Sequence, residues 1–195
     1  REVLDVIELD PDVRVAILTG AGRAFSAGFD LERESRDADP HDMSADEWRD
    51  HLKTYIDTFM MIWNISKQVI AAVNGYCLGA GLTLLSTCDI RVASETAEFG
   101  LPEVRRGIVP TLGATQRLPR QLPFALAMEM LLLGEHMSAA EAERHGLVNT
   151  VVPQSQVMDT ARAYAARFLQ DPPLTVRAIK EAAIRGQSMP IEEGM

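Results

Sequence analysis

Runs of apolar, β-branched residues alternate with segments of helical periodicity along this chain. Three apolar runs, at residues 13–19, 69–73 and 90–94, predict strands that are buried on both faces. A fourth predicted strand covers residues 147–152 and is stopped by Pro153. Because helical segments separate these strands, the pattern predicts an α/β fold in one domain.

Helices are predicted where apolar residues recur every three or four positions. Ser44 and Glu47 form a capping box, and so do Ser138 and Glu141. The helix after Ser44 has one apolar face, which we expect to be buried, made of Trp48, Leu52, Tyr55, Ile56, Phe59, Met60 and Trp63. Further helices are predicted within residues 80–87, 124–133 and, on either side of Pro172 and Pro173, 156–186. The charged stretch 32–42 predicts a mobile surface loop.

Composition limits the class of protein. The chain has 195 residues, of which 47% are hydrophobic and 24% charged, as expected for a soluble globular domain. Its net charge of −9 argues against a nucleic-acid-binding surface. No apolar run reaches the roughly 18 residues that a transmembrane helix needs, so no membrane partner is expected. The first residues lack the apolar segment of a signal peptide, and we therefore expect a cytoplasmic location.

Cysteine and histidine are sparse. Cys77 and Cys88 lie in apolar segments, which favours two buried, reduced thiols over a disulfide. The four histidines lack the spacing of metal ligands, and no metal site is predicted at His41, His51, His136 or His145.

Two glycine-containing turns each follow a predicted strand. Residues 25–31 follow the first strand, and residues 78–82 follow the second. Small residues let a ligand approach the backbone closely, and a helix that begins near Ala80 has free N–H groups. Two such turns that converge form a pocket for negative charge that develops on an oxygen atom. Either turn taken alone is more simply an ordinary turn.

A dinucleotide-binding fold is the alternative interpretation of the second turn. Gly79 and Gly81 follow a strand and open a helix, and Glu95 follows the next strand. The third glycine of the dinucleotide fingerprint is absent, because Leu84 occupies its position. The sequence therefore favours this alternative less.

Several segments, taken in order, resemble the crotonase (enoyl-CoA hydratase/isomerase) family. They are residues 24–31, 72–81, 99–110, 116–119, 140–152 and 172–180. The resemblance extends over nearly the whole chain, and the ordered combination is far more specific than either glycine turn. It implies an α/β fold built as a spiral of repeated ββα units with C-terminal helices. Residues 1–153 would form the core, and residues 154–195 a helical region of the same domain that serves as an oligomerisation layer.

The resemblance also implies a substrate and an assembly. Members of the family act on acyl-CoA thioesters, so coenzyme A enters as part of the substrate and no permanently bound cofactor is expected. A homotrimer or homohexamer is implied, with an interface that includes Phe168, Leu169, Leu174, Val176, Ala178 and Ile179. The family's N-terminal strand, and the loop there that helps to hold CoA, are not recognised in the sequence from Arg1 onward.

Site residues follow from the same comparison. The resemblance assigns the backbone N–H groups of Ala27 and Ala80 to an oxyanion hole and Glu103 to acid/base catalysis. The family's other catalytic glutamate would fall at Thr83. The aspartate of dienoyl-CoA isomerases would fall near Thr111, which is not acidic. The residues implied to bind substrate are Ala24, Ser26, Asp30, Leu31, Gly79, Pro102, Thr111 and Gly113.

A single carboxyl group selects among the reactions of the family. Glu103 lies beside Pro102, and partial burial there raises the pKa of a carboxyl group toward neutrality, which suits proton transfer. Syn hydration must activate water and also deliver a proton, and the hydroxyl group of Thr83 is a poor base. A shift of the double bond needs one shuttling group, so isomerase-like activity is favoured. Two alternatives stay open: a hydratase whose second group is unusual, such as Asp30, Glu32 or Glu34, and a weakly catalytic acyl-CoA-binding protein.

Overall fold

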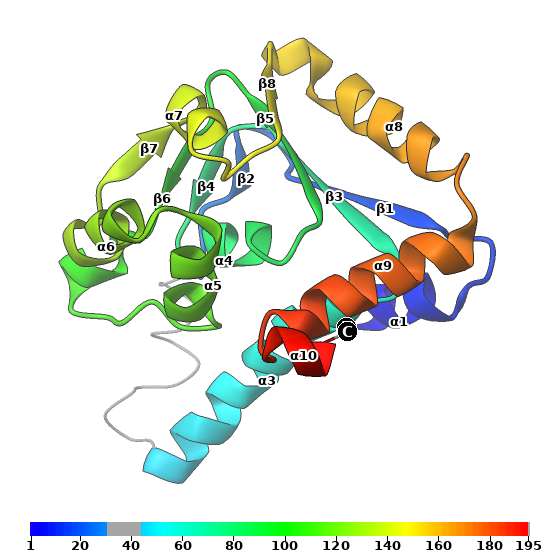
Figure 1. The fold of residues 1–195 in the computed structure, drawn as a ribbon. Coiled ribbons are helices and arrows are strands. Elements are labelled where there is room, and N and C mark those ends of the chain that lie inside the picture. The colour runs from blue at the N-terminus through cyan, green and yellow to red at the C-terminus, as the bar shows by residue number, and fades with distance from the viewer. Residues whose placement is uncertain (31–43, 195) are drawn as a thin grey trace.

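In a computed structural model, residues 1–30 and 44–194 are described, and they form two four-stranded sheets (Figure 1). The strands of the first sheet are all parallel and follow the order β1 (Val15–Thr19), β3 (Gln68–Val73), β5 (Ile90–Ser94) and β8 (Thr150–Val152). The second sheet follows the order β2 (Ala24–Ser26), β4 (Tyr76–Leu78), β6 (Glu98–Gly100) and β7 (His136–Ser138). Strand β7 is antiparallel to β6, and the other pairs in this sheet are parallel.

Consecutive strands enter the two sheets alternately. The pairs β1–β2, β3–β4 and β5–β6 each contribute one strand to the first sheet and the next strand to the second. Each pair is followed by helical structure, namely α3 (Ala45–Asn64), α4 (Ala80–Leu85) and the 3-10 helix η1 (Pro102–Arg106). This repetition is a spiral of ββα units, and helices complete the C-terminal part of the chain (Figure 1). The predicted fold class is confirmed.

Strand β3 separates two apolar cores. All six of its residues are buried. Val69, Ala71 and Val73 pack in the larger core between the sheets, whereas Ile70 and Ala72 pack against α8 (Val157–Phe168) on the other face. Alternate residues of a strand point to opposite faces, so a strand that is covered on both sides has a continuous apolar sequence.

The two thiols are buried on the side of the larger core, as the sequence predicted. Burial raises the pKa of Cys77 well above its ordinary value and raises the pKa of Cys88 to about 12. Nearby, the buried guanidinium group of Arg91 donates hydrogen bonds to the carbonyl oxygens of Ser86, Cys88 and Leu147. Three carbonyl partners satisfy a buried cation that would otherwise be costly.

Most of the predicted helices are present. These include α6 (Phe124–Leu133), α7 (Ala139–Arg144), α8 and α9 (Pro173–Gly186). The sequence pattern did not indicate α1 (Glu2–Leu9), α5 (Ala114–Gln121), the 3-10 helix η2 (Gln154–Gln156) or α10 (Ile191–Gly194). Within residues 1–30 and 44–194, none of the helices is both long enough and apolar enough to span a membrane.

Strand β8 is shorter than the predicted strand at 147–152. The N–H groups of Leu147 and Val148 both donate to the carbonyl oxygen of Ala142 at the end of α7. The N–H groups of these two residues therefore bond to the end of α7 and not to a neighbouring strand. Pairing with β5 begins at Thr150.

Helix α3 has the predicted N-terminal cap but not the predicted buried face. Its capping box is formed, because Ser44 Oγ accepts a hydrogen bond from the N–H of Glu47 and the Glu47 carboxylate accepts one from the N–H of Ser44. Within α3, all of which is described, Ile62 alone is buried, and Trp48 is 37% exposed. The prediction of a buried apolar face is wrong, because α3 extends away from the two sheets (Figure 1). The predicted loop at 32–42 lies outside the described residues.

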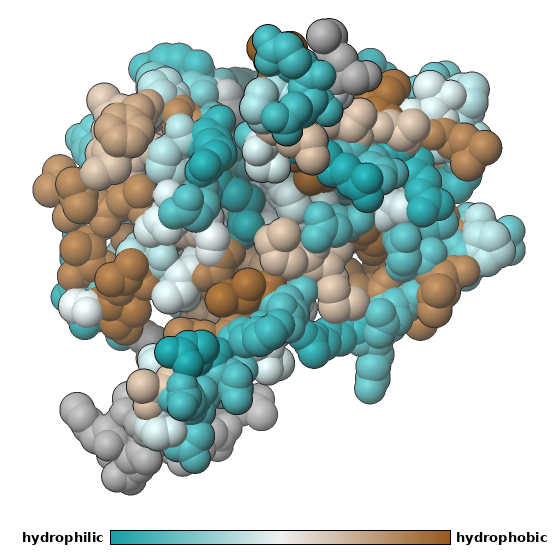
Figure 2. All heavy atoms as spheres, turned by 60° about the horizontal axis from the view of Figure 1, so that its bottom comes forward, coloured by the Kyte–Doolittle hydropathy of each residue, from teal (hydrophilic) through white to brown (hydrophobic). Residues whose placement is uncertain are grey.

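Several apolar side chains of α6 are exposed to solvent. Phe124, Leu132 and Leu133 are 67%, 61% and 55% exposed. Figure 2 shows apolar side chains gathered on the left of the molecule, the side on which α6 lies in Figure 1. The opposite face of this helix reaches the core through Ala127 and Met130.

Candidate active site

Three neighbouring strands of the second sheet lead into the segments that carry Ala27, Ala80 and Glu103. Strands β2, β4 and β6 are parallel, with Ser26 paired to Cys77 and Leu78 paired to Gly100. Their carboxyl ends therefore meet at one edge of the sheet, which is where open parallel sheets generally bind ligands. The two glycine-containing turns follow β2 and β4, and the helical turn η1 follows β6.

The two glycine-containing turns are in contact. A Cβ atom on Gly81 would lie 2.5 Å from the backbone oxygen of Ser26. A Cβ atom on Gly28 would lie 3.4 Å from the backbone nitrogen of Ala80. The absence of a side chain at Gly81 thus allows the two backbones to converge.

Each of the two turns contains a backbone N–H group that is held by a hydrogen bond. Gly79 has a φ of +57°, and its N–H group donates to the carbonyl oxygen of Gly100 over 2.9 Å. Ala80 is the first residue of α4, so its N–H has no acceptor within the helix. In the first turn, Ala27 is exposed and Gly28 N–H donates to Ser26 Oγ over 3.3 Å. Gly28 thus lies beside the backbone nitrogen of Ala80, the first residue of α4.

The carboxyl group of Glu103 lies over the second turn. A Cβ atom on Gly79 would be 3.3 Å from Glu103 Oε1. Glu103 Oε2 is buried and has no hydrogen-bond partner among the described residues. Burial raises the pKa of Glu103 and outweighs a hydrogen bond from its own backbone, which acts in the opposite direction. A carboxyl group with a raised pKa and an unpaired oxygen atom is suited to accept and return a proton.

Helix α6 supports the segment that carries Glu103. Arg105 donates hydrogen bonds to the carbonyl oxygen of Leu133 and to Glu135 Oε1, over 3.2 and 3.0 Å. The N–H group of Ile108 donates to the carbonyl oxygen of Glu103 over 3.1 Å and closes the turn. The turn that carries Glu103 is thus closed by Ile108 and tied through Arg105 to the end of α6.

Thr83 lies one helical turn behind Gly79. Its side chain is buried, with 2% exposed, and its hydroxyl group donates to the carbonyl oxygen of Gly79 over 3.4 Å. The position that would carry a second glutamate thus holds a hydroxyl group directed to the backbone of the second turn.

The other predicted substrate-binding residues have different placements. Ala24 and Ser26 belong to β2, and Pro102 begins η1. Asp30 is exposed at the end of a described segment, and Leu31 lies outside the described residues. The remaining two lie in the turn before α5: the carbonyl oxygen of Thr111 accepts from Ala114, and a Cβ atom on Gly113 would meet the guanidinium group of Arg117.

Sequence reasoning missed a row of aromatic rings beside the first turn. The ring of Phe29 contacts that of Tyr55 edge-on, with centroids 5.0 Å apart. Tyr55 contacts His51 edge-on at 5.1 Å, and His51 stacks on Trp48 at 5.5 Å. The spacing of the three α3 residues gave a signal for a shared face, but nothing in the sequence linked that face to Phe29.

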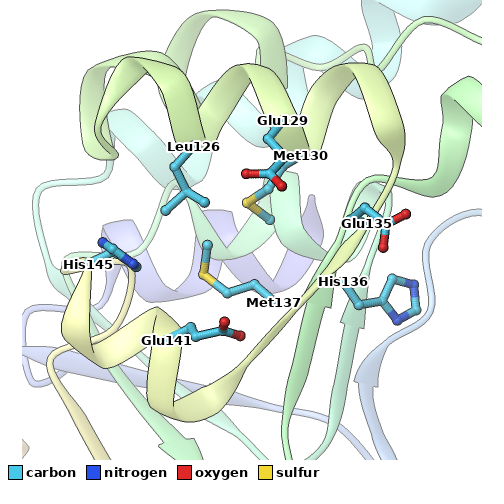
Figure 3. A pocket seen from close by; sticks show the side chains of 8 residues that line it. All are labelled: Leu126, Glu129, Met130, Glu135, His136, Met137, Glu141 and His145. Carbon is cyan, nitrogen blue, oxygen red and sulfur yellow. The ribbon is translucent and has the colours of Figure 1, made fainter.

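Two cavities lie away from these residues. One, of about 120 Å³, lies between α6 and α7, where Met130 and Met137 face each other (Figure 3). Another, of about 330 Å³, lies beneath α9 and is bordered by Cys88 and Lys180. Glu103 lines neither cavity, so neither belongs to the candidate active site.

Comparison with protein families identifies one that matches the entire chain. The family model described as "Enoyl-CoA hydratase/isomerase" matches residues 1–195. An (E)-benzylidenesuccinyl-CoA hydratase from Thauera aromatica is 44% identical over 195 residues, which are 100% of this chain and 73% of that protein. A carnitinyl-CoA dehydratase from Salmonella paratyphi A is 44% identical over 192 residues, which are 95% of this chain and 69% of that protein.

Solved structures give the same result. An enoyl-CoA hydratase subunit from Geobacillus kaustophilus superposes with a TM-score of 0.88 and 40% identity, over 100% of this chain and 74% of that one. An enoyl-CoA hydratase from Bacillus anthracis superposes with a TM-score of 0.90 and 36% identity, over 99% of this chain and 73% of that one.

Proposed function

The chain belongs to the enoyl-CoA hydratase/isomerase family, and we propose that it moves a proton at the α-carbon of an enoyl-CoA thioester, with Glu103 as the acid/base. The observation that carries the proposal is the position of the Glu103 carboxyl group, which lies over Gly79 at the meeting point of the two turns. Its Oε2 atom is buried without a protein partner among the described residues, and burial raises its pKa.

The backbone N–H groups of Ala27 and Ala80 would stabilise the intermediate. Removal of the α-proton places negative charge on the thioester oxygen, and amides fixed at that oxygen bind the enolate more strongly than the ground-state carbonyl. The contact between Gly28 and Ala80 supports this role, because the two turns lie side by side there. Small side chains at both positions leave the approach to the backbone open.

With one carboxyl group, the reaction that fits best is a shift of the double bond. Glu103 accepts a proton from C2 of a 3-enoyl-CoA, and the electron pair of that C–H bond is delocalised onto the thioester oxygen as a dienolate. When the dienolate collapses, the carbonyl group re-forms, a double bond forms between C2 and C3, and the electrons of the C3–C4 double bond take up the proton that Glu103 returns to C4. Thr83 supports this choice, because its buried hydroxyl group already bonds to the carbonyl oxygen of Gly79 and is not a base near neutral pH.

Hydration is the second candidate, and the names of the relatives favour it. The two relatives described above are named as a hydratase and a dehydratase, and both names denote transfer of water. In this chain Glu103 would deliver or remove the α-proton, and a water molecule would need a second group to orient it. The hydroxyl group of Thr83 can orient water without acting as its base.

A panel of substrates tests both candidates. Purified protein is assayed with 2-enoyl-CoA and 3-enoyl-CoA esters of equal length for hydration and for isomerisation, alongside Glu103→Gln. We expect isomerisation to exceed hydration and Glu103→Gln to lower turnover about 10²–10⁴-fold while acyl-CoA binding is retained. Turnover that survives in Glu103→Gln contradicts the assignment of the base. If the parent protein binds acyl-CoA but turns over none of the substrates, the result supports an acyl-CoA-binding protein without this catalytic activity.

An oligomer is proposed on separate grounds. The two long helices of the C-terminal region differ in burial. Helix α8 buries Val157 and Ala161 against the core, whereas α9, described throughout, has no buried residue. Leu174 and Ile179 on α9 are 77% and 64% exposed. We propose that a second copy of the chain covers α9 in a homotrimer or homohexamer. Sedimentation at micromolar concentration tests this, and a stable monomer contradicts it.

A further inference from the structure

The aromatic row begins two residues after the first candidate oxyanion donor. Ala27 precedes Phe29 by two residues, and a chain of two residues spans at most about 7 Å. From Phe29 the row continues through Tyr55 and His51 to Trp48, with successive ring centroids 5.0, 5.1 and 5.5 Å apart. The acyl part of a thioester held at Ala27 would therefore meet aromatic rings within a few carbon atoms of its carbonyl group.

Core packing does not account for this row. None of its four residues belongs to the buried core, and Trp48 is 37% exposed. The buried residue of α3, Ile62, lies nearer the other end of the helix. Aromatic side chains that are ordered against one another and left partly open to solvent are available to an apolar ligand.

We propose that this row forms one wall of the acyl-binding site and that the enzyme favours acyl groups carrying an aromatic ring. The inference rests on the proposed function, because it takes Ala27 as the amide that holds the thioester oxygen. A ring of the substrate would extend the row from Phe29 in the edge-to-face or offset geometry that its members already use. Phe29 and Tyr55 are then the residues that determine specificity.

The geometry favours a ring over a quaternary ammonium group. A cation binds best over the open faces of several aromatic rings that converge on it. Here the face of Trp48 stacks on His51, and Tyr55 makes edge contacts with both His51 and Phe29, so the rings form a row rather than a cage. A saturated chain would gain apolar contact with Phe29 but would lack the quadrupole interaction between rings.

Binding of unreactive saturated thioesters tests the inference without dependence on the reaction type. Calorimetry compares 4-phenylbutanoyl-CoA, 4-cyclohexylbutanoyl-CoA and 4-(trimethylammonio)butanoyl-CoA, with butanoyl-CoA as the reference. The cyclohexyl ester matches the phenyl ester in size and lacks the aromatic ring. We expect the phenyl ester to bind about two- to tenfold more tightly than the cyclohexyl ester.

Substitutions test whether the aromatic row causes the preference for the phenyl ester over the cyclohexyl ester. Phe29→Leu and Tyr55→Leu are each expected to remove most of the ratio between phenyl and cyclohexyl esters, and Tyr55→Phe to retain it. Phe124→Leu makes the same substitution at a 67%-exposed ring on α6 and is expected to leave the ratio unchanged. Circular dichroism and thermal melting confirm that each variant is folded.

The outcomes separate this inference from the proposed function. If all four esters bind with equal affinity, or if Phe29→Leu and Tyr55→Leu keep the phenyl preference, the aromatic site is excluded while acyl-CoA binding stands. Tightest binding of the trimethylammonio ester also overturns the inference. If none of the esters binds, the proposed function itself fails.

Discussion

The backbone oxygen of Ser26 lies 2.5 Å from the position that a Cβ atom would take on Gly81. A side chain at Gly81 would therefore push the two glycine-containing turns apart. We expect Gly81→Ala to lower turnover about 10²-fold or more, because loss of one oxyanion donor typically costs 10²–10³-fold in other enzymes. Steady-state kinetics measure the effect. Gly186→Ala, where no atom would approach the new Cβ, is the control and is expected to keep full activity.

The raised pKa of Glu103 predicts how stability depends on pH. Burial disfavours the charged carboxylate, so the folded protein holds this proton to a higher pH than the unfolded chain does. The free energy of unfolding therefore falls as pH rises from the ordinary pKa of a glutamate through the raised one. Glutamine cannot ionise, so Glu103→Gln does not lose stability as the pH rises. In urea unfolding, the free energy of unfolding of Glu103→Gln is expected to exceed that of the parent protein at pH 7 and to equal it near pH 4.

Glu141 provides a control of opposite sign. Hydrogen bonds from the Ser138 hydroxyl group and backbone lower its pKa. The folded state thus releases this proton at a lower pH, and the stabilisation is present above the ordinary pKa of a glutamate and is lost as pH falls through the lowered value. Glu141→Gln is therefore expected to lose stability at pH 7 and to change little at the lowest pH. A shift of the same sign in both variants would contradict the assignment for Glu103.

The side chain of Lys180 ties helix α9 to the core. Lys180 Nζ donates to Asp89 Oδ2 over 2.7 Å and to the carbonyl oxygen of Lys67 over 2.8 Å, and its side chain is 10% exposed. We expect Lys180→Met to cost about 2 kcal/mol and to speed amide hydrogen exchange across α9. Arg185→Met on the same helix breaks the exposed pair with Glu181 and is expected to have little effect. Equal exchange in both variants would show that Lys180 does not hold the helix.

The sequence pattern predicted the strands of the first sheet and none of the strands of the second. Strand β3 is buried on both faces, so five of its six residues are apolar, and the prediction of a strand at 69–73 found those five. Strands β2, β4 and β6 have three residues each, which are too few to show a period of two. The site lies at the ends of these short strands, so its residues were assigned by resemblance to a family.

Local chemistry was more predictable than burial. Both capping boxes formed, because each depends only on residues three positions apart. The apolar face of α3 was correctly placed on a helix and wrongly buried, since periodicity identifies which side chains share a face and not what covers them. The contact between Phe29 and Tyr55 joins residues 26 positions apart, and no spacing rule relates them.

Thr83 provides the most direct test of the reaction type. Its hydroxyl group is bonded to the carbonyl oxygen of Gly79, so Thr83→Ala is expected to reduce isomerisation only a few-fold. Thr83→Glu places a second carboxyl group one turn from Gly79, in the same helix and within the site that contains Glu103. If that carboxyl group can activate water, hydration of a 2-enoyl-CoA rises relative to isomerisation of the matching 3-enoyl-CoA.

Thr83→Gln is the control for this substitution, because it has nearly the same size as glutamate and cannot act as a base. An increase in hydration that occurs in Thr83→Glu and not in Thr83→Gln assigns the gain to the carboxyl group. Thr83 is 2% exposed, so thermal melting must first show that both variants are folded. Efficient hydration by the parent protein, lost in Thr83→Ala, would show that a hydroxyl group suffices and that the missing glutamate does not exclude hydratase activity.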